Sequence, residues 1–231
     1  MDYVDTPTRW QGVIVRKRTN DSEKWVGIVL EALRTIASCH SGQQLLDGIS
    51  AWYAQRQAAG NPPPYAVCIL PKDSHRTKPS VTLIPGIKSL DIAPLTVARG
   101  TRVYEEGSVT KSAGDDKASD GRGTFSAIRW DPIRVDTPDG ARPAYIALAH
   151  ELIHAYNNML GRSYLTGTSL ANAPAAVQTA VANAPNAPDT RYKHVDEWAT
   201  VGLHGFGAGQ ITENQIRQEL GIAPRSNYTL D

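Results

Sequence analysis

The chain has 231 residues, enough for one sizeable hydrophobic core or at most two small ones. Its 24 basic and 23 acidic residues are interspersed and leave a formal net charge of +1, which excludes the electrostatic signature of a protein that binds nucleic acid or an anionic membrane. No run of eighteen apolar residues is present, so no membrane span is predicted, and the first residues lack the basic-then-apolar pattern of a secretory signal peptide. Cys39 and Cys68 have apolar neighbours and no C-x-x-C spacing, so we expect free thiols in a domain suited to a reducing cytosol.

The first half of the chain predicts two helices followed by strands. Apolar residues recur at three- and four-residue steps over about 21–36 and 42–59, and Gly60 marks the end of the second helix. The residues expected in the core from these helices are Trp25, Ile28, Val29, Leu33, Ile36, Leu45, Leu46, Ile49 and Trp52. The triple proline at 62–64 separates the helices from strand-like runs at 65–70 and 80–84. We expect residues 1–20 to be only a short N-terminal segment, and the domain to span 21–231.

The second half predicts a loop, a strand and further helices. Residues 105–123 are polar and glycine-dotted, which is typical of a mobile loop, and 124–130 reads as a short strand. A helix is expected over 143–160, a short one near 175–182, one around 195–203 and one from 212 to 220. With no internal repeat and no linker, the pattern predicts a single α+β domain with a small β-sheet.

The pentapeptide His150-Glu151-Leu152-Ile153-His154 has the H-E-x-x-H spacing that is typical of zinc peptidases. Histidines four residues apart on a helix lie on one face, with their Cβ atoms about 5–6 Å apart, so both imidazoles can bind one zinc ion. Glu151 projects beside such a metal, where it can take a proton from water. The motif lies within a well-marked helix, with Pro143 in its first turn and Gly161 as its stop. A pair of buried structural histidines is the alternative reading.

A catalytic zinc site needs a third protein ligand and one open position. The extended motif with a third histidine needs glycine and histidine where this chain has Asn157 and Leu160, so it is excluded. A downstream Gly-Thr-x-x-Asp arrangement also fails, because Gly167-Thr168 leads to Ala171. The remaining source is the later helix, in which Glu197 is the candidate ligand.

Other residues around Glu197 leave alternatives open. His194 and His204 compete with Glu197 for the role of third ligand. Asp196 is suited to accept a hydrogen bond from the outer N–H of a ligating histidine. Both carboxylates are also explained by the preference of acidic residues for the N-terminal end of a helix.

The C-terminal segment adds long polar side chains. Thr212 and Gln215 form a predicted capping box, so a helix begins there, and Gly221 ends it. Arg217, Arg225 and Tyr228 can each reach a peptide or an oxyanion, but as single residues each is more typical of an ordinary protein surface.

Taken in order, four blocks resemble the NleD/HopH-type family of bacterial effector zinc metallopeptidases, with a gluzincin-like HExxH site. The blocks are His150–Ala155, Asp196–Leu203, Thr212–Arg217 and Leu220–Arg225 with Tyr228. The strongest likeness covers about residues 143–228, and the acidic Thr-Val-Gly-Leu block with the Thr-Glu-Asn block is far more specific than the pentapeptide. The family often has Glu-Glu where this chain has Asp196-Glu197, and the shorter first side chain favours Glu197 as the ligand.

The resemblance implies a zincin-like domain in which His150, His154 and Glu197 bind Zn²⁺, Glu151 is the catalytic base and Tyr228 is a site residue. It implies a secreted virulence effector, delivered by type III secretion, that cleaves host signalling proteins in the host cytosol; enzymes of this family cut mitogen-activated protein kinases. Two alternatives remain: the protease toxin domain of a larger polymorphic toxin, and an inactive module that binds a host protein. We further expect the strand at 124–130 to hold the substrate by edge pairing.

Overall fold

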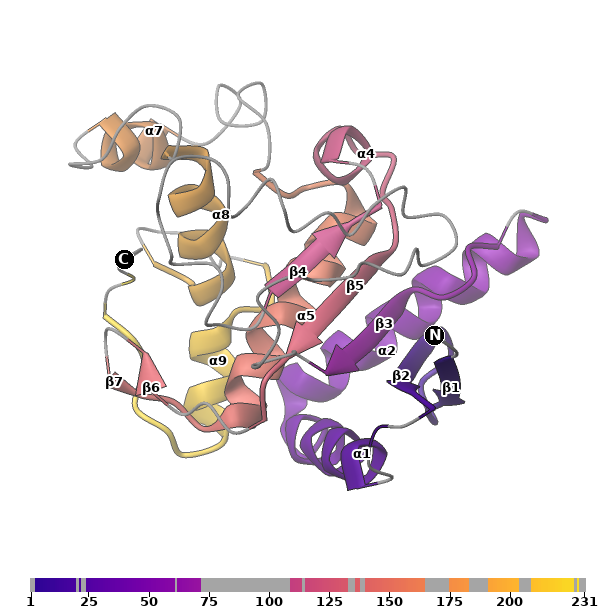
Figure 1. Cartoon of the computed structure of the whole chain (residues 1–231). Helices are drawn as coiled ribbons and strands as arrows, with labels where there is room; N and C mark the ends of the chain where they lie inside the picture. Colours follow the sequence, from indigo (N-terminus) through magenta and orange to yellow (C-terminus); the bar gives the residue numbers. More distant parts are fainter. Residues whose placement is uncertain are drawn as a thin grey trace, which may run out of the picture.

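The computed structural model describes residues 3–19, 21, 24–60, 62–71, 109–113, 115–132, 136–137, 140–164, 175–182, 191–203, 209–226 and 228. It has the predicted mixed α+β fold (Figure 1). The strands are β1 (Tyr3–Pro7), β2 (Val13–Arg18), β3 (Val67–Pro71), β4 (Val109–Ser112), β5 (Ser126–Trp130), β6 (Asp136–Thr137) and β7 (Gly140–Ala141). The helices are α1 (Lys24–Ile36), α2 (His40–Ala58), α4 (Asp115–Ser119), α5 (Ala144–Leu160), α7 (Ala175–Ala182), α8 (Arg191–Val201) and α9 (Glu213–Glu219). Of the helices described, none has the length and apolar character needed to cross a bilayer.

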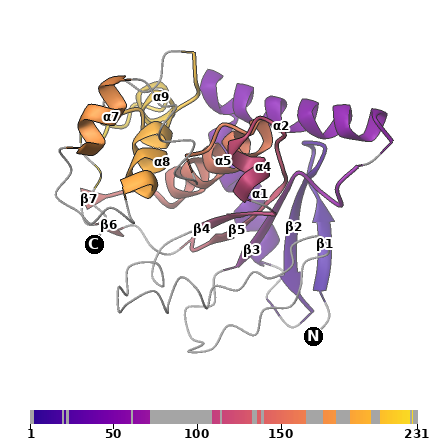
Figure 2. The same ribbon diagram turned by 90° about the horizontal axis from the view of Figure 1, so that it is seen from above.

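Five strands form one mixed sheet in the order β1-β2-β3-β5-β4. The inner strands β2, β3 and β5 are parallel, whereas β1 and β4 pair antiparallel at the two edges. The helices gather on one side of this sheet, as Figure 2 shows. Strands β6 and β7 form a separate hairpin just before α5.

Two strands of the sheet lie before residue 21, where the sequence predicted only a short segment. In β2, Val13 and Val15 are buried against the helices, and Ile14 between them faces the other way, as the two-residue period of a strand requires. The neighbouring β1 is largely exposed and polar, and Asp5 pairs with Arg16 across the two strands. A strand of this kind lacks the apolar run by which strands are recognised in a sequence.

The strand expected at 124–130 is present as β5, but the edge-pairing hypothesis for it is wrong. It is an interior strand, paired with β3 on one side and with β4 on the other, so its backbone groups are already used. The edge of the described sheet on this side is β4.

The described part of 105–123 is ordered, in contrast to the predicted mobile loop. It contains β4 and α4, and the turn after α4 closes the C-terminal end of α5. Thr124 N donates to Asn158 O (3.0 Å), so a carbonyl left over at the helix end is satisfied. Gly123 lies so close to this end that an added Cβ would be 1.9 Å from Met159 O. The predicted strand at 80–84 lies outside the described residues.

Both N-terminal helices form as predicted, with one exception in the buried face of α1. Trp25, Val29, Leu33 and Ile36 are buried, but Ile28 is 44% exposed. Ile28 precedes Val29 directly and therefore lies about 100° around the helix from it. A run of adjacent apolar residues does not by itself show which one faces the core.

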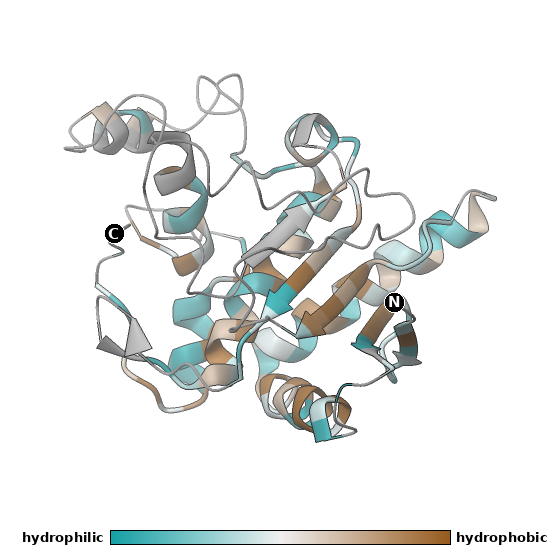
Figure 3. Ribbon diagram, viewed as in Figure 1, coloured by the Kyte–Doolittle hydropathy of each residue, from teal (hydrophilic) through white to brown (hydrophobic). Residues whose placement is uncertain are grey.

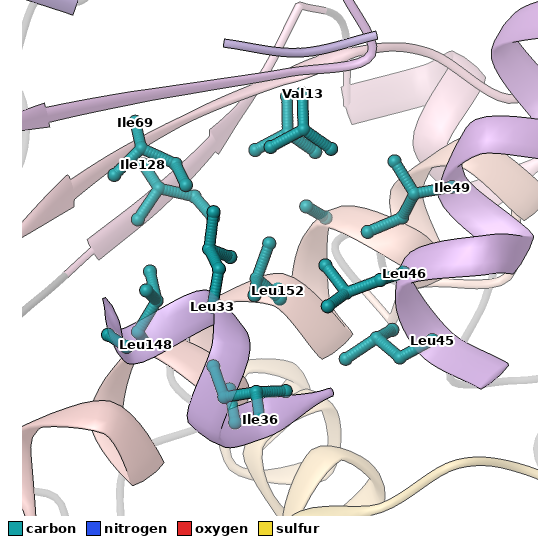
Figure 4. Close-up of a cluster of buried hydrophobic side chains, with 14 of the residues drawn as sticks. Val13, Leu33, Ile36, Leu45, Leu46, Ile49, Ile69, Ile128, Leu148 and Leu152 are labelled. Atoms are coloured by element: carbon teal, nitrogen blue, oxygen red, sulfur yellow. The ribbon is translucent and has the colours of Figure 1, made fainter. Parts of the chain in front are cut away.

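The main core lies between the sheet and the helices, as the side chains in Figure 4 show. Val67 and Ile69 of β3 face this core, while Cys68 and Leu70 join a smaller cluster on the opposite face. Because both faces of β3 are buried, the strand is almost continuously apolar, and it is mostly brown in Figure 3. Cys39 and Cys68 are both buried free thiols.

Helix α5 runs through the middle of the helical layer and is anchored firmly. Leu148 and Leu152 are fully buried, and complete burial of such a side chain contributes about 1.5–3 kcal/mol. The helix begins directly after Pro143, which is its N-cap and not, as predicted, part of its first turn. It stops before Gly161, which adopts the predicted left-handed conformation (φ 68°). This rigid element carries His150, Glu151 and His154.

Candidate metal centre

Two histidines of α5 converge on one point. His150 and His154 are one helical turn apart and nearly fully buried. Their Nε2 atoms are 3.1 Å apart, and their rings are inclined at 75°. The four-residue spacing therefore places the two imidazoles side by side, as predicted from the sequence.

Glu197 of α8 completes a group of three donors. Its Oε2 lies 2.8 Å from His150 Nε2 and 3.3 Å from His154 Nε2. Around a tetrahedral zinc ion with bonds of about 2.0–2.1 Å, neighbouring donor atoms are about 3.3 Å apart, so the triangle has nearly the right size. These three residues form a group that could hold a metal ion.

A carboxylate holds the outer nitrogen of each histidine. His150 Nδ1 lies 2.7 Å from Glu213 Oε2, and His154 Nδ1 lies 2.9 Å from Asp196 Oδ2. An ionised carboxylate only accepts hydrogen bonds, so both Nδ1 atoms must donate. With a neutral ring, each Nε2 lone pair then points toward the Glu197 carboxylate, so the three atoms form a group that could hold a metal ion.

The acidity of these groups reflects the same arrangement. Burial alone would lower the pKa of both histidines, but Glu197 outweighs it, with help from Glu213 at His150 and from Asp196 at His154. The result is a raised pKa for His150 and one well above the ordinary value for His154. Burial would likewise raise the pKa of Glu197, yet the two histidines hold it well below its usual range. In the metal-free protein, protons therefore occupy a centre that attracts cations.

Asp196 contacts the outer nitrogen of a histidine of the centre, as the sequence suggested. While Oδ2 faces His154, Oδ1 accepts a hydrogen bond from the backbone N–H of Tyr164 at 2.8 Å. Thr200 Oγ1 is 3.2 Å from the same His154 nitrogen. Asp196 is thus directed at the outer side of His154 and not at the three converging donors.

The competing histidines receive no support from the described structure. His194 lies in α8, although its side chain is not among the described ones, and His204 lies outside the described residues. Glu197 is therefore the third donor that the described side chains bring to the two imidazoles.

Glu151 and Tyr228 flank the centre. Glu151 is buried beside His150, and the Tyr228 ring is stacked on the His150 ring, with 5.9 Å between centroids. Burial raises the pKa of Tyr228 well above its ordinary value, and the carboxylates of Glu197 and Glu151 raise it further. The phenol consequently stays protonated at neutral pH and can donate a hydrogen bond at the centre.

Glu213 was missed as a site residue by reasoning from the sequence. It lies in the first turn of α9, where the predicted capping box of Thr212 and Gln215 is confirmed and where an acidic residue needs no further explanation. The contact to His150 joins positions 63 residues apart, which no local pattern reveals. The Thr-Glu-Asn block in the family resemblance was the signal that could have pointed to it.

A comparison with protein families places this chain in a known family of effector proteins. The model for Peptidase_M91, described as an effector protein, matches residues 16–228, and this range includes every residue of the centre. A search of curated proteins found no match.

Proposed function

This chain belongs to the Peptidase_M91 family of effector proteins, and we propose that it is a zinc-dependent endopeptidase of zincin-like architecture. The observation that carries the proposal is the convergence of two imidazole Nε2 atoms and one carboxylate oxygen, each within 3.3 Å of the others. His150, His154 and Glu197 are the proposed zinc ligands.

The donor set supports zinc in preference to magnesium or calcium. Two imidazoles and one carboxylate are the ligands of a well-known type of catalytic zinc site. Magnesium and calcium prefer sites built from oxygen atoms alone. The buried carboxylates at both Nδ1 atoms also match zinc sites, in which such partners fix the orientation of the ligating rings.

The proposed reaction is hydrolysis of a peptide bond. Zinc, when bound, supplies a Lewis acid that makes water more acidic and polarises the scissile carbonyl. Glu151 accepts a proton from the attacking water and then delivers it to the nitrogen of the leaving amine. Tyr228, kept protonated by its surroundings, donates a hydrogen bond to the oxyanion that develops on the carbonyl oxygen.

An extended substrate would pair with the outer edge of β4. This strand is at the edge of the described sheet and packs beside α5, which carries the two histidines. Addition of a peptide strand to an exposed edge supplies backbone hydrogen bonds without restricting the sequence. Side chains near the centre would then decide which peptide bond is cut.

The proposed substrates are host signalling proteins, including mitogen-activated protein kinases, and the site of action is the host cytosol. Membership of a family of effector proteins supports a protein substrate inside a host cell. A non-enzymatic binding module is less well supported, because such a module has no need for Glu151 or for an intact set of three metal donors. A toxin domain with the same chemistry would act by the same residues on a different target.

Terminal-peptide proteomics tests this proposal. Host-cell lysate is treated with wild-type protein and with Glu151→Ala, and the zinc content of both proteins is measured. We expect new protein termini with wild type alone, although both proteins bind zinc. Identical sets of termini, with zinc bound in both proteins, would show that Glu151 drives no proteolysis in the lysate.

A further inference from the structure

Glu213 is a fully buried carboxylate that is not one of the proposed metal donors. Its exposure is 0%, and its Oε2 lies 2.7 Å from His150 Nδ1, on the side of the ring that faces away from Glu197. The contact of this carboxylate with His150 indicates that its role is exerted through that ring.

Arginines keep this carboxylate ionised. Arg217 Nε donates to Glu213 Oε1 at 2.6 Å, Arg225 Nη1 lies 3.5 Å from Oε2, and Arg142 Nη1 lies 3.8 Å from it. An unpaired buried carboxylate would instead become neutral, because burial of an isolated charge is costly.

An ionised carboxylate at this position determines the state of His150. Because it only accepts, His150 must place its proton on Nδ1 when the ring is neutral. The lone pair is then on Nε2, 2.8 Å from Glu197 Oε2, where a metal ion would be held. A neutral acceptor in place of Glu213 would fix the ring less strongly and make Nε2 a weaker donor.

The surroundings of α9 hold Glu213 in register with the rest of the site. Thr212, the N-cap of α9, packs against Gly202 at the end of α8, where an added Cβ would be 2.9 Å from Thr212 Oγ1. Asn214 exchanges two hydrogen bonds with the backbone of Arg225, and the Arg225 guanidinium lies 4.5 Å from the Tyr228 ring centroid. One short helix thus links the element that carries Glu197 to the segment that carries Tyr228.

We propose that Glu213 is a positioning residue, which acts through His150 to set the affinity of the centre for zinc. This inference rests on the proposed function, because it presupposes that His150 binds zinc through Nε2. Asp196 occupies the equivalent place at His154, so each ligating imidazole is held by its own carboxylate.

Three variants separate positioning from mere stabilisation of the fold. Glu213→Gln keeps the shape of the side chain and removes its charge. The double variant Glu213→Gln/Arg217→Gln also removes the buried guanidinium that would lose its ion pair with Glu213. Glu219→Gln is the matched control: it makes the same change on the same helix, at a carboxylate that accepts hydrogen bonds from Ser41 N and Oγ at 2.7 and 2.6 Å and contacts no metal donor.

The zinc dissociation constant is measured by competition with a chromophoric chelator. We expect it to rise about 10–100-fold in both Glu213 variants and to stay unchanged in Glu219→Gln. Stability of the metal-free protein should fall in Glu213→Gln and recover in the double variant. Recovery of zinc affinity along with stability in the double variant would overturn the proposal, because Glu213 would then act only by balancing Arg217.

The wild type distinguishes failure of this inference from failure of the proposed function. If wild type binds zinc and both Glu213 variants bind it equally tightly, positioning is refuted and the peptidase proposal stands. If wild type binds no zinc, both the positioning role of Glu213 and the zinc-peptidase proposal are refuted.

Proton NMR of the zinc-loaded wild type tests the same proposal without the Glu213 variants, in case these variants fail to fold. We expect a slowly exchanging, strongly downfield imidazole N–H resonance from His150, as a charge-assisted hydrogen bond gives. A rapidly exchanging His150 Nδ1 proton would overturn the proposal.

Discussion

The Tyr228 phenol ring lies parallel to the His150 imidazole, with 5.9 Å between the ring centroids and 9° between the ring planes. The stack places an uncharged hydrogen-bond donor next to a proposed zinc ligand. Removal of the hydroxyl alone should therefore affect the reaction and spare the metal.

Tyr228→Phe should keep the stacked ring and lose the donor to the oxyanion. We expect the rate at which new termini appear in host lysate to fall about 10²–10³-fold, as is usual for the loss of one such donor. Zinc content should not change. Tyr53→Phe on α2 is the control, and an undiminished rate for Tyr228→Phe would remove Tyr228 from the reaction.

Asp196→Asn should loosen His154. The amide can still accept from Nδ1, but it lacks the charge that strengthens the hydrogen bond seen at 2.9 Å. We expect a zinc dissociation constant about 10–100-fold higher than that of wild type, measured by chelator competition. Equal affinity would mean that Asp196 serves only to bind the backbone of Tyr164.

The effect of zinc on stability should depend on pH in a definite direction. In the metal-free protein the pKa values of His150 and His154 are raised, so their ion pairs stabilise the fold fully below the unfolded-state pKa of about 6.5. This contribution is lost as the pH rises through the raised folded-state values. Zinc must displace the same protons, so its affinity increases with pH.

Melting temperatures of the metal-free and zinc-loaded protein, compared at a mildly acidic and a mildly alkaline pH, check this prediction. The difference between the two forms should be larger at the higher pH. A difference that shrinks as the pH rises would be inconsistent with zinc and protons competing for the same donors.

Two isoleucines on α1 provide a matched test of the core. Ile36 is fully buried and Ile28 is 44% exposed, although both were expected in the core. Ile36→Ala should lower the free energy of unfolding by about 2–5 kcal/mol, because it leaves a cavity. Ile28→Ala should change it by about 0.5 kcal/mol or less, as surface substitutions do. Urea unfolding measures both free energies. Similar losses in Ile36→Ala and Ile28→Ala would contradict the different burial of the two side chains.

Local signals in the sequence were sufficient for most of the helices. Pro143 and Gly161 delimit α5, and Thr212 with Gln215 starts α9, because such caps act within a few residues. The strands β1, β2 and β4 escaped prediction. The edge strands β1 and β4 are short and mostly polar, and each gains its stability from pairing with a neighbouring strand. In β2 the apolar run is only three residues long. The pairing of these strands depends on the whole sheet and not on their own sequence.

In the candidate site, too, the residues placed by local spacing could be predicted, and those that depend on distant contacts could not. The spacing of His150 and His154 on one helix is a local property, so their convergence could be predicted. Glu197 was predicted as a ligand by elimination and from the family resemblance. Its contact with His150, more than forty positions away, produces no periodic pattern in the sequence. Glu213 was hidden by an adequate local explanation, its place in the first turn of a capped helix.

The most direct test of a zinc centre built from these residues is the zinc content of purified wild type and Glu197→Ala, measured by elemental analysis after dialysis against zinc-free buffer. Both proteins should be folded, as judged by circular dichroism. We predict stoichiometric zinc in the wild type and a large loss in Glu197→Ala. Wild-type protein without zinc, or full zinc occupancy in Glu197→Ala, would contradict the proposed centre.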